Sequence, residues 1–126
     1  MEEYIYKEEC FKIIGCAMEV HKELGSGFLE SVYQEALHYE FEQNAILYKE
    51  FPTLEIFYKN IVFSKKYIPD FVCFDKIIVE LKVAKSISDE HYAQVLNYLK
   101  ATKLKLGLIL NFGCSSLEFK RVILSK

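Results

Sequence analysis

The chain has 126 residues, of which 52% are hydrophobic and 27% are charged, and its formal net charge is −2. This balance is ordinary for a soluble globular protein with a single domain, residues 1–126, and by itself gives no reason to expect a nucleic-acid partner. No apolar run approaches about 20 residues and the first residues are acidic (Glu2, Glu3, Glu8 and Glu9), so we expect a cytoplasmic protein without a membrane span.

Two helices are predicted in the first third of the chain. Apolar residues recur at helical spacing over residues 3–24, and Gly25 is a suitable stop. A second helix is predicted over residues 28–43, with Glu30 and Tyr33 on one stripe. A Glu in the first turn complements the helix dipole, so Glu30 has a structural interpretation as well as a functional one.

The next stretch changes to a β pattern. Residues 46–58 and 61–63 are rich in aromatic and branched side chains, with Lys59-Asn60 as the hairpin turn between them. Pro52 predicts an edge position or a break. The aromatic side chains here pack in a sheet in the simpler interpretation and stack on bases in the other. They are Tyr48, Phe51, Phe57, Tyr58 and Phe63.

The central stretch, residues 68–85, places charged side chains in two strands that otherwise look buried. In the second strand, Glu80 and Lys82 point to the same face because side chains alternate with period two. A three-residue loop at 74–76 would set Asp70 opposite Glu80, whereas a two-residue loop would make Asp70 face away.

The two carboxylates of this stretch need a partner, because an ionised carboxylate away from water is unfavourable unless it is paired or bound to a cation. Asp70 and Glu80 on one face, with backbone carbonyls nearby, suit a hard divalent ion such as Mg²⁺. Lys82 can orient or deprotonate a water, or balance negative charge. The alternative is a Glu80–Lys82 ion pair on a solvated sheet edge.

A third helix is predicted over residues 89–101, capped by Ser86 or Ser88, since residues 86–89 have the spacing of a capping box. One helix face is apolar and suits a core. A second face is polar, and from the helix pattern alone it is interpreted as solvent-exposed surface. It carries His91, Gln94 and Tyr98.

Two strands follow. Residues 107–112 form an apolar run without alternation, as in a strand buried on both faces, and residues 117–124 form the last strand. The order helix, helix, β meander, helix, strand, strand predicts an α/β sandwich, with a central mixed sheet that contains an antiparallel hairpin and is flanked by helices. The third helix should connect two parallel strands.

The net charge hides a split along the chain. Residues 1–58 contain 12 acidic and 4 basic residues, a balance of −8, and residues 59–126 contain 6 and 12, a balance of +6. Because local potential attracts phosphate, a basic surface near the proposed site is one interpretation, and lysines spread over several faces are the other. The basic residues concerned are Lys59, Lys65, Lys66, Lys85, Lys100, Lys103, Lys105, Lys120 and Arg121.

The four cysteines, Cys10, Cys16, Cys73 and Cys114, are predicted to be reduced core residues. They are widely spaced, without a CxxC pair or a companion histidine at zinc-ligand spacing. We therefore expect no metal cluster and no disulfide.

Three stretches carry a family resemblance. Pro69-Asp70 followed by Glu80-Leu81-Lys82 resembles the PD-(D/E)XK signature of the restriction-endonuclease-like nucleases. Residues 27–33, GFLESVY, resemble the GxxExxY signature of a small family of uncharacterised proteins placed in that superfamily. Residues 91–99 resemble the helix with Gln and Tyr that follows the nuclease lysine. Together they cover nearly the whole chain in the expected order.

The resemblance implies a restriction-endonuclease-like three-layer sandwich and a nuclease that depends on Mg²⁺ or Mn²⁺. It assigns Asp70 and Glu80 to the metal, with Glu30 as a third carboxylate that acts directly or through water. It assigns Lys82 to positioning or activating the nucleophile and to stabilising the charge that develops.

The resemblance also implies the supporting residues and the partner. Gln94 and Tyr98 are expected to turn towards the site and to contact the water, Lys82 or a phosphate. Tyr33 is expected to steady Glu30 or to contact a phosphate. The expected substrate is nucleic acid, DNA in preference to RNA, and cutting both strands of a duplex would need a homodimer or a larger assembly.

Two other classes of function stay open. One is a nuclease-fold module that binds nucleic acid or a protein without cutting, although the presence of Asp70, Glu80, Lys82 and Gln94 favours catalysis. The other is a structural or oligomerising protein in which Asp70, Glu80 and Lys82 form a buried ion network. In that case the loss of one charge would destabilise the fold.

Overall fold

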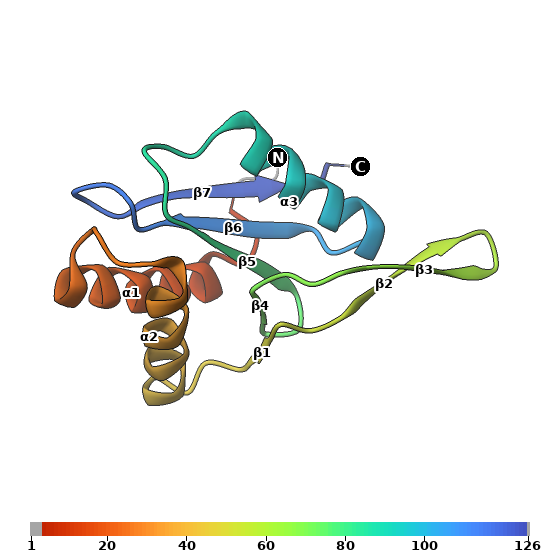
Figure 1. Cartoon of the computed structure of the whole chain (residues 1–126). Helices are drawn as coiled ribbons and strands as arrows, with labels where there is room; N and C mark the ends of the chain where they lie inside the picture. Colours follow the sequence, from red (N-terminus) through yellow and green to blue (C-terminus); the bar gives the residue numbers. More distant parts are fainter. Residues whose placement is uncertain (1–3, 126) are drawn as a thin grey trace.

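The computed structural model describes residues 4–125, which contain helices at the start and one between the fifth and sixth strands (Figure 1). The elements are α1 (Lys7–Leu24), α2 (Glu30–Gln43), β1 (Tyr48–Glu50), β2 (Leu54–Tyr58), β3 (Ile61–Tyr67), β4 (Phe71–Cys73), β5 (Ile77–Lys82), α3 (Asp89–Thr102), β6 (Leu106–Asn111) and β7 (Glu118–Ile123).

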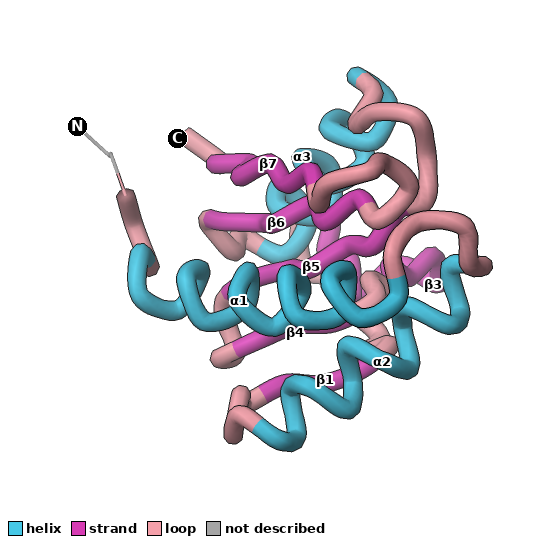
Figure 2. The backbone as a smooth tube through the Cα atoms, turned by 90° about the vertical axis from the view of Figure 1, so that its left-hand side faces the viewer, coloured by secondary structure: helices cyan, strands magenta, loops and turns pink. Residues whose placement is uncertain are grey.

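The larger sheet has the strand order β1-β4-β5-β6-β7. β5 and β6 are parallel, with α3 in the connection between them, and the other neighbouring pairs are antiparallel. α1 and α2 cover one face of this sheet, and α3 lies on the other (Figure 2). The predicted three-layer sandwich, with the β4–β5 hairpin inside a mixed sheet, is therefore confirmed.

The two faces of β5 serve the two helical layers. Val79 and Leu81 are buried in the core on the side of α1 and α2, whereas Ile78 is buried in the core on the side of α3. Because side chains alternate along a strand, Glu80 and Lys82 share the α3 side with Ile78. The alternation that the sequence predicted thus keeps the charged side chains of β5 out of the core on the side of α1 and α2.

The ends of the first two helices depend on backbone conformation. α1 begins at Lys7, and the expected start at residue 3 lies outside the described residues. It ends before Gly25, which has a φ of 69°, a conformation that glycine adopts without a Cβ penalty. α2 begins at Glu30, slightly later than expected, because Leu29 is extended. None of the helices within residues 4–125 is both long and apolar enough to cross a membrane.

The predicted β meander is wrong. β1 pairs with β4, while β2 and β3 form a separate two-stranded hairpin that extends away from the body of the molecule (Figure 1). The chain leaves the larger sheet at Phe51, which has a φ of 50°, and Pro52 then lacks an N–H for a ladder. The predicted break at Pro52 and the turn at Lys59-Asn60 are confirmed.

The capping box predicted at residues 86–89 is wrong, and Ser88 caps α3 by a different pair. The His91 amide donates to Ser88 Oγ at 3.1 Å, and the Ser88 amide donates to His91 Nδ1 at 3.1 Å. The imidazole takes the place that Glu or Gln has in the usual box. His91 is therefore a capping residue.

The β4–β5 turn has the odd length on which the predicted site depends. Cys73 pairs with Ile77, which leaves residues 74–76 in the turn. The last pair of this antiparallel register is Phe71 with Val79, so one further residue on each strand brings Asp70 opposite Glu80.

We expect Gly113→Ala to destabilise the fold by about 1–3 kcal/mol, because a Cβ there would overpack the turn after β6. That Cβ would lie 2.5 Å from both the backbone N and the backbone O of Ala84, which cannot rotate away as a side chain can.

Gly15→Ala is the matched control, since a Cβ at this exposed position of α1 meets no atom within 4 Å. It should stabilise the protein by about 0.5–1 kcal/mol, because Ala is the better helix former. Urea unfolding measures both variants, and equal midpoints for the two would contradict the prediction.

Candidate functional site

Asp70 and Glu80 each bind the strand that carries the other. The Asp70 amide donates to Glu80 Oε2 at 2.9 Å, and the Leu81 amide donates to Asp70 Oδ2 at 2.7 Å. These two bonds extend the hydrogen bonding between β4 and β5 beyond the paired strand residues. In both of them a side-chain carboxylate, and not a backbone carbonyl, accepts the bond from the backbone amide. The predicted position of Asp70 opposite Glu80 is confirmed.

Burial makes this carboxylate pair electrostatically unfavourable. The Glu80 side chain lies in the middle of the sheet, and the residue is 5% exposed. Burial, followed by the charge of Asp70, raises the pKa of Glu80 to about 8. Burial also raises the pKa of Asp70, although the Leu81 amide and Lys82 oppose that shift. A cation beside the pair would relieve this cost.

Lys82 lies at the end of β5 and is held from α3. Its Nζ donates to Gln94 Oε1 at 3.2 Å. Its positive charge opposes the rise in the pKa of Glu30, Asp70 and Glu80, so the ammonium group acts on all three carboxylates. The expected contact between Gln94 and Lys82 is therefore present in the structure.

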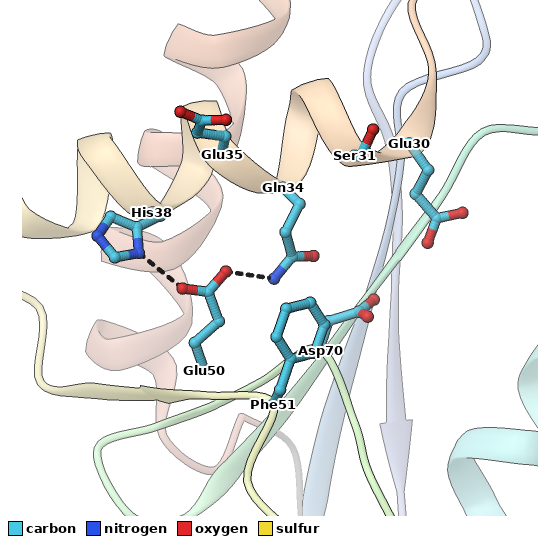
Figure 3. A pocket seen from close by; sticks show the side chains of 8 residues that line it. All are labelled: Glu30, Ser31, Gln34, Glu35, His38, Glu50, Phe51 and Asp70. Atoms are coloured by element: carbon cyan, nitrogen blue, oxygen red, sulfur yellow. Dashed lines mark hydrogen bonds and ion pairs between the residues drawn. The ribbon is translucent and has the colours of Figure 1, made fainter.

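Glu30 approaches the pair from the opposite helical layer. It is the first residue of α2, and in Figure 3 its side chain and that of Asp70 extend to the same end of a cleft. Desolvation, followed by the charge of Asp70, raises the pKa of Glu30, and Lys82 lowers it. Glu30, Asp70 and Glu80 therefore form one electrostatically coupled group.

The cleft contains polar residues that the sequence analysis missed. It has a volume of about 590 Å³ and lies between α2 and the end of β1 (Figure 3). Gln34 Nε2 donates to Glu50 Oε2 at 2.8 Å, and His38 Nδ1 lies 2.6 Å from Glu50 Oε1. The charge of Glu50 also raises the pKa of Asp70. The network therefore borders the carboxylate group.

Part of this network had a signal in the sequence. Glu30, Gln34 and His38 stand at i, i+4 and i+8, so they form one stripe of α2. Glu50 had no such signal, because its place beside the site depends on β1 pairing with β4 across a long separation in sequence.

Tyr33 does not line the site. It is fully buried, its hydroxyl donates to Gly25 O at 2.5 Å and accepts from the Phe28 amide at 3.3 Å, and its ring stacks on Phe112 at 4.7 Å. Its burial is incompatible with the expected phosphate contact. Tyr33 instead fastens the loop that precedes α2 and in this way positions Glu30.

Tyr98 is more buried than we expected for a residue on a polar face of α3. The residue is 9% exposed, and its ring packs against Tyr67 with centroids 4.6 Å apart. Desolvation, followed by the charges of Glu80 and Asp70, raises the pKa of Tyr98 to about 12. The hydroxyl therefore stays protonated near the carboxylates and can donate a hydrogen bond.

A buried asparagine fixes the segment between Lys82 and α3. The fully buried Asn111 accepts from the Ala84 amide at 3.0 Å and donates to Ala84 O at 3.0 Å. It also donates to Glu118, which accepts from the Ile87 amide. This clamp was not predicted, because an isolated Asn at the end of an apolar strand gives no sign of its partners.

The donor set suits a hard divalent cation that keeps part of its water shell. Among residues 4–125, no three His, Cys, Asp or Glu side chains are already arranged as a metal cage. Mg²⁺ needs fewer protein ligands, since one or two carboxylates commonly hold it together with waters. Asp70 and Glu80 each bind a backbone amide through one oxygen only, which leaves a second carboxylate oxygen for such a cation.

Comparison with known proteins gives a family and a fold. A family model described as the PD-(D/E)XK nuclease superfamily matches residues 7–122. The crystal structure of SSO0001 is similar, with a TM-score of 0.57 and 15% sequence identity over 94% of this chain. This chain spans 57% of that protein, and at such identity the likeness concerns the fold alone. No curated protein matches the chain.

The matched range contains the sandwich except for the last residue of β7, and Asp70, Glu80 and Lys82 lie within it. The likeness of residues 27–33 to the GxxExxY signature stays a prediction. The chain belongs to the PD-(D/E)XK nuclease superfamily.

Proposed function

We propose that this protein is a phosphodiesterase that depends on Mg²⁺ or Mn²⁺ and hydrolyses the backbone of nucleic acid, with DNA as the preferred substrate over RNA. Asp70 and Glu80 would hold the cation, and Glu30 would contribute directly or through a bound water. The observation that carries the proposal is the buried Asp70–Glu80 pair, whose raised pKa values indicate a site short of positive charge.

The geometry of the site supports hydrolysis of a phosphate ester. A divalent cation at this pair would lower the pKa of a bound water and polarise the scissile phosphate. Lys82, held by Gln94, is placed to orient the attacking water and to balance charge on the phosphate. Tyr98 offers a protonated hydroxyl on the same side of the sheet, where a phosphate oxygen would accept its proton.

One such site cuts one strand at a time. We propose that cleavage of both strands of a duplex would need two copies of the chain, because the described residues supply a single arrangement of Asp70, Glu80 and Lys82.

Glu80→Gln and Lys82→Ala should each lower the rate of Mg²⁺-dependent cleavage by more than about 100-fold while the fold stays intact. Glutamine can still accept the Asp70 amide bond, so the loss would come from the missing charge. Gel assays on single-stranded and double-stranded DNA and on RNA measure the rates, with circular dichroism to check the fold.

Lys12→Ala is the matched control, because Lys12 is exposed on α1, in the helical layer on the other side of the sheet from Lys82. Its rate should equal that of the wild type. If the purified Glu80→Gln protein cleaves at the wild-type rate, the assignment is wrong and a binding module without catalysis becomes the better interpretation.

In EDTA, the wild-type protein should lose stability as the pH rises from about 5 to about 9. The pKa of Glu80 is raised from 4.5 to about 8 in the folded state, so folding binds a proton in this window and the stabilisation is lost as Glu80 ionises. Glu80→Gln should therefore be more stable than the wild type at pH 9 by about 1–4 kcal/mol and nearly equal at pH 5. Thermal denaturation at both pH values, with and without Mg²⁺, makes the comparison. A constant difference between the two proteins would contradict it.

Glu30→Gln should weaken cleavage by about 10-fold or more, because a third negative charge near the cation would be lost. Glu35→Gln is the control from the same helix, since Glu35 points away from Asp70 in Figure 3. Titration of Mg²⁺ against the cleavage rate separates weaker metal binding, which shifts the midpoint, from a slower reaction at saturation. Identical curves for Glu30→Gln and wild type would remove Glu30 from the site.

A further inference from the structure

The β2–β3 hairpin exposes apolar side chains that no part of the described chain covers. It extends beyond the two packed cores (Figure 1), and the residues at its outer end are between 39% and 61% exposed. They are Phe57, Tyr58, Ile61, Val62 and Phe63. A cluster of this kind on a surface indicates a binding partner.

The hairpin carries flat rings suited to stacking. Tyr58 and Phe63 lie on neighbouring strands with ring centroids 5.6 Å apart and an angle of 25° between their planes. Lys59 Nζ lies 5.5 Å from the centre of the Tyr58 ring. Aromatic rings combined with a cation form the usual platform for an unpaired base and its phosphate.

The charge of the hairpin favours an anionic partner. Residues 54–67 contain three lysines, Lys59, Lys65 and Lys66, and one acidic residue, Glu55. Lys66 lies 4.0 Å from Glu55, at the limit of an ion pair, whereas Lys65 is exposed. A second copy of the hairpin would bring these lysines against one another, which disfavours self-association through this surface.

Other basic residues do not extend this surface evenly. Arg121 donates to Ile5 O at 2.6 Å and lies over the Tyr4 ring, and Lys120 lies over the Tyr92 ring. Arg121 and Lys120 therefore belong to basic residues that are spread over several faces and do not form one basic surface at the site. Lys65 and Lys66 are different, because they line a cleft together with Gln94 and Tyr98.

The base of the hairpin is linked to the carboxylate site through Gln94. A cleft of about 480 Å³ runs between β3 and α3, lined by Lys65, Lys66, Gln94, Asn97 and Tyr98 among others. Gln94 also holds Lys82, and Asp70 follows the end of β3 after a short segment. A nucleic-acid strand lying in this cleft would pass Gln94, which holds Lys82, and would run beside Lys65, which lies two residues after Phe63 on β3.

We propose that the β2–β3 hairpin is a stacking arm for unpaired bases. It would grip a single-stranded segment of nucleic acid whose backbone runs along the cleft towards Lys82. This inference rests on the proposed function and narrows it: the substrate class is nucleic acid with a single-stranded stretch next to the scissile phosphate, not a fully paired duplex.

The test compares binding in EDTA, where no metal-dependent cleavage occurs. Fluorescence anisotropy measures the affinity of a labelled oligothymidylate and of a blunt duplex of the same length. Tyr58→Leu and Phe63→Leu keep apolar bulk for the cross-strand pair but remove the ring face. Each should weaken oligothymidylate binding by about tenfold and leave duplex binding nearly unchanged.

Two variants and one size measurement serve as controls. Tyr58→Phe keeps a ring and should bind like the wild type. Tyr39→Leu removes an exposed ring from α2, far from the hairpin in the fold, and should also bind like the wild type. Light scattering records whether each protein is a monomer, and circular dichroism records whether it is folded.

The outcomes separate the arm from the catalytic proposal. Unchanged oligothymidylate affinity in both leucine variants would overturn the arm even if the wild type cleaves DNA. Leucine variants that lose a wild-type dimer without losing affinity would overturn it in favour of a self-association surface. Ring-dependent binding by a wild type that does not cleave with Mg²⁺ would support the arm and refute the proposed hydrolysis.

Discussion

The candidate site is built around a carboxylate that is buried in the middle of a sheet, where its ionised form is unfavourable. Glu80 occupies a position of β5 where its neighbours on both sides are apolar, and it is 5% exposed. A buried charge of this kind persists in a fold only if backbone amides, a counter-charge or a cation compensate for its lost hydration. The Asp70 amide and Lys82 supply part of that compensation. The pKa of about 8 indicates that they do not supply all of it.

The elements around Glu80 hold Asp70, Lys82 and Gln94 in place. The three-residue turn sets the register that brings Asp70 opposite it, and the parallel β5–β6 pair places Lys82 beside Asn111. Asn111 then clamps the segment that leads to α3, the helix from which Gln94 reaches Lys82. The turn is local, whereas the β5–β6 pair and the Asn111–Ala84 contacts join parts of the chain that are distant in sequence, so Lys82 and Gln94 come together only when β6 has paired with β5.

The two sides of the site differ in charge and in shape. On the side of α2 lies an acidic and polar cleft with Glu30, His38 and Glu50, and on the side of α3 lies a cleft that carries lysines and tyrosines. This division corresponds to the charge split between the two parts of the chain, because α2 and β1 come from the acidic part and β3 and α3 from the basic part. A polyanion would approach from the basic side, and a cation would be attracted from the acidic side.

Local pattern in the sequence determined the elements and the central pair. Helical spacing marked α1, α2 and α3. Period-two alternation placed Asp70 opposite Glu80 for one of the two loop lengths that the sequence left open, and the structure has that length, because a hairpin turn sets register over a few residues. Only the tertiary structure decided which distant strands pair and which side chains become buried or stay exposed. It paired β1 with β4, brought Glu50 and His38 beside the site, turned Tyr33 into the core, and left the aromatic rings of the hairpin exposed. The physical reason is that long-range pairing is chosen by the packing of whole layers, a quantity that no short stretch of sequence contains.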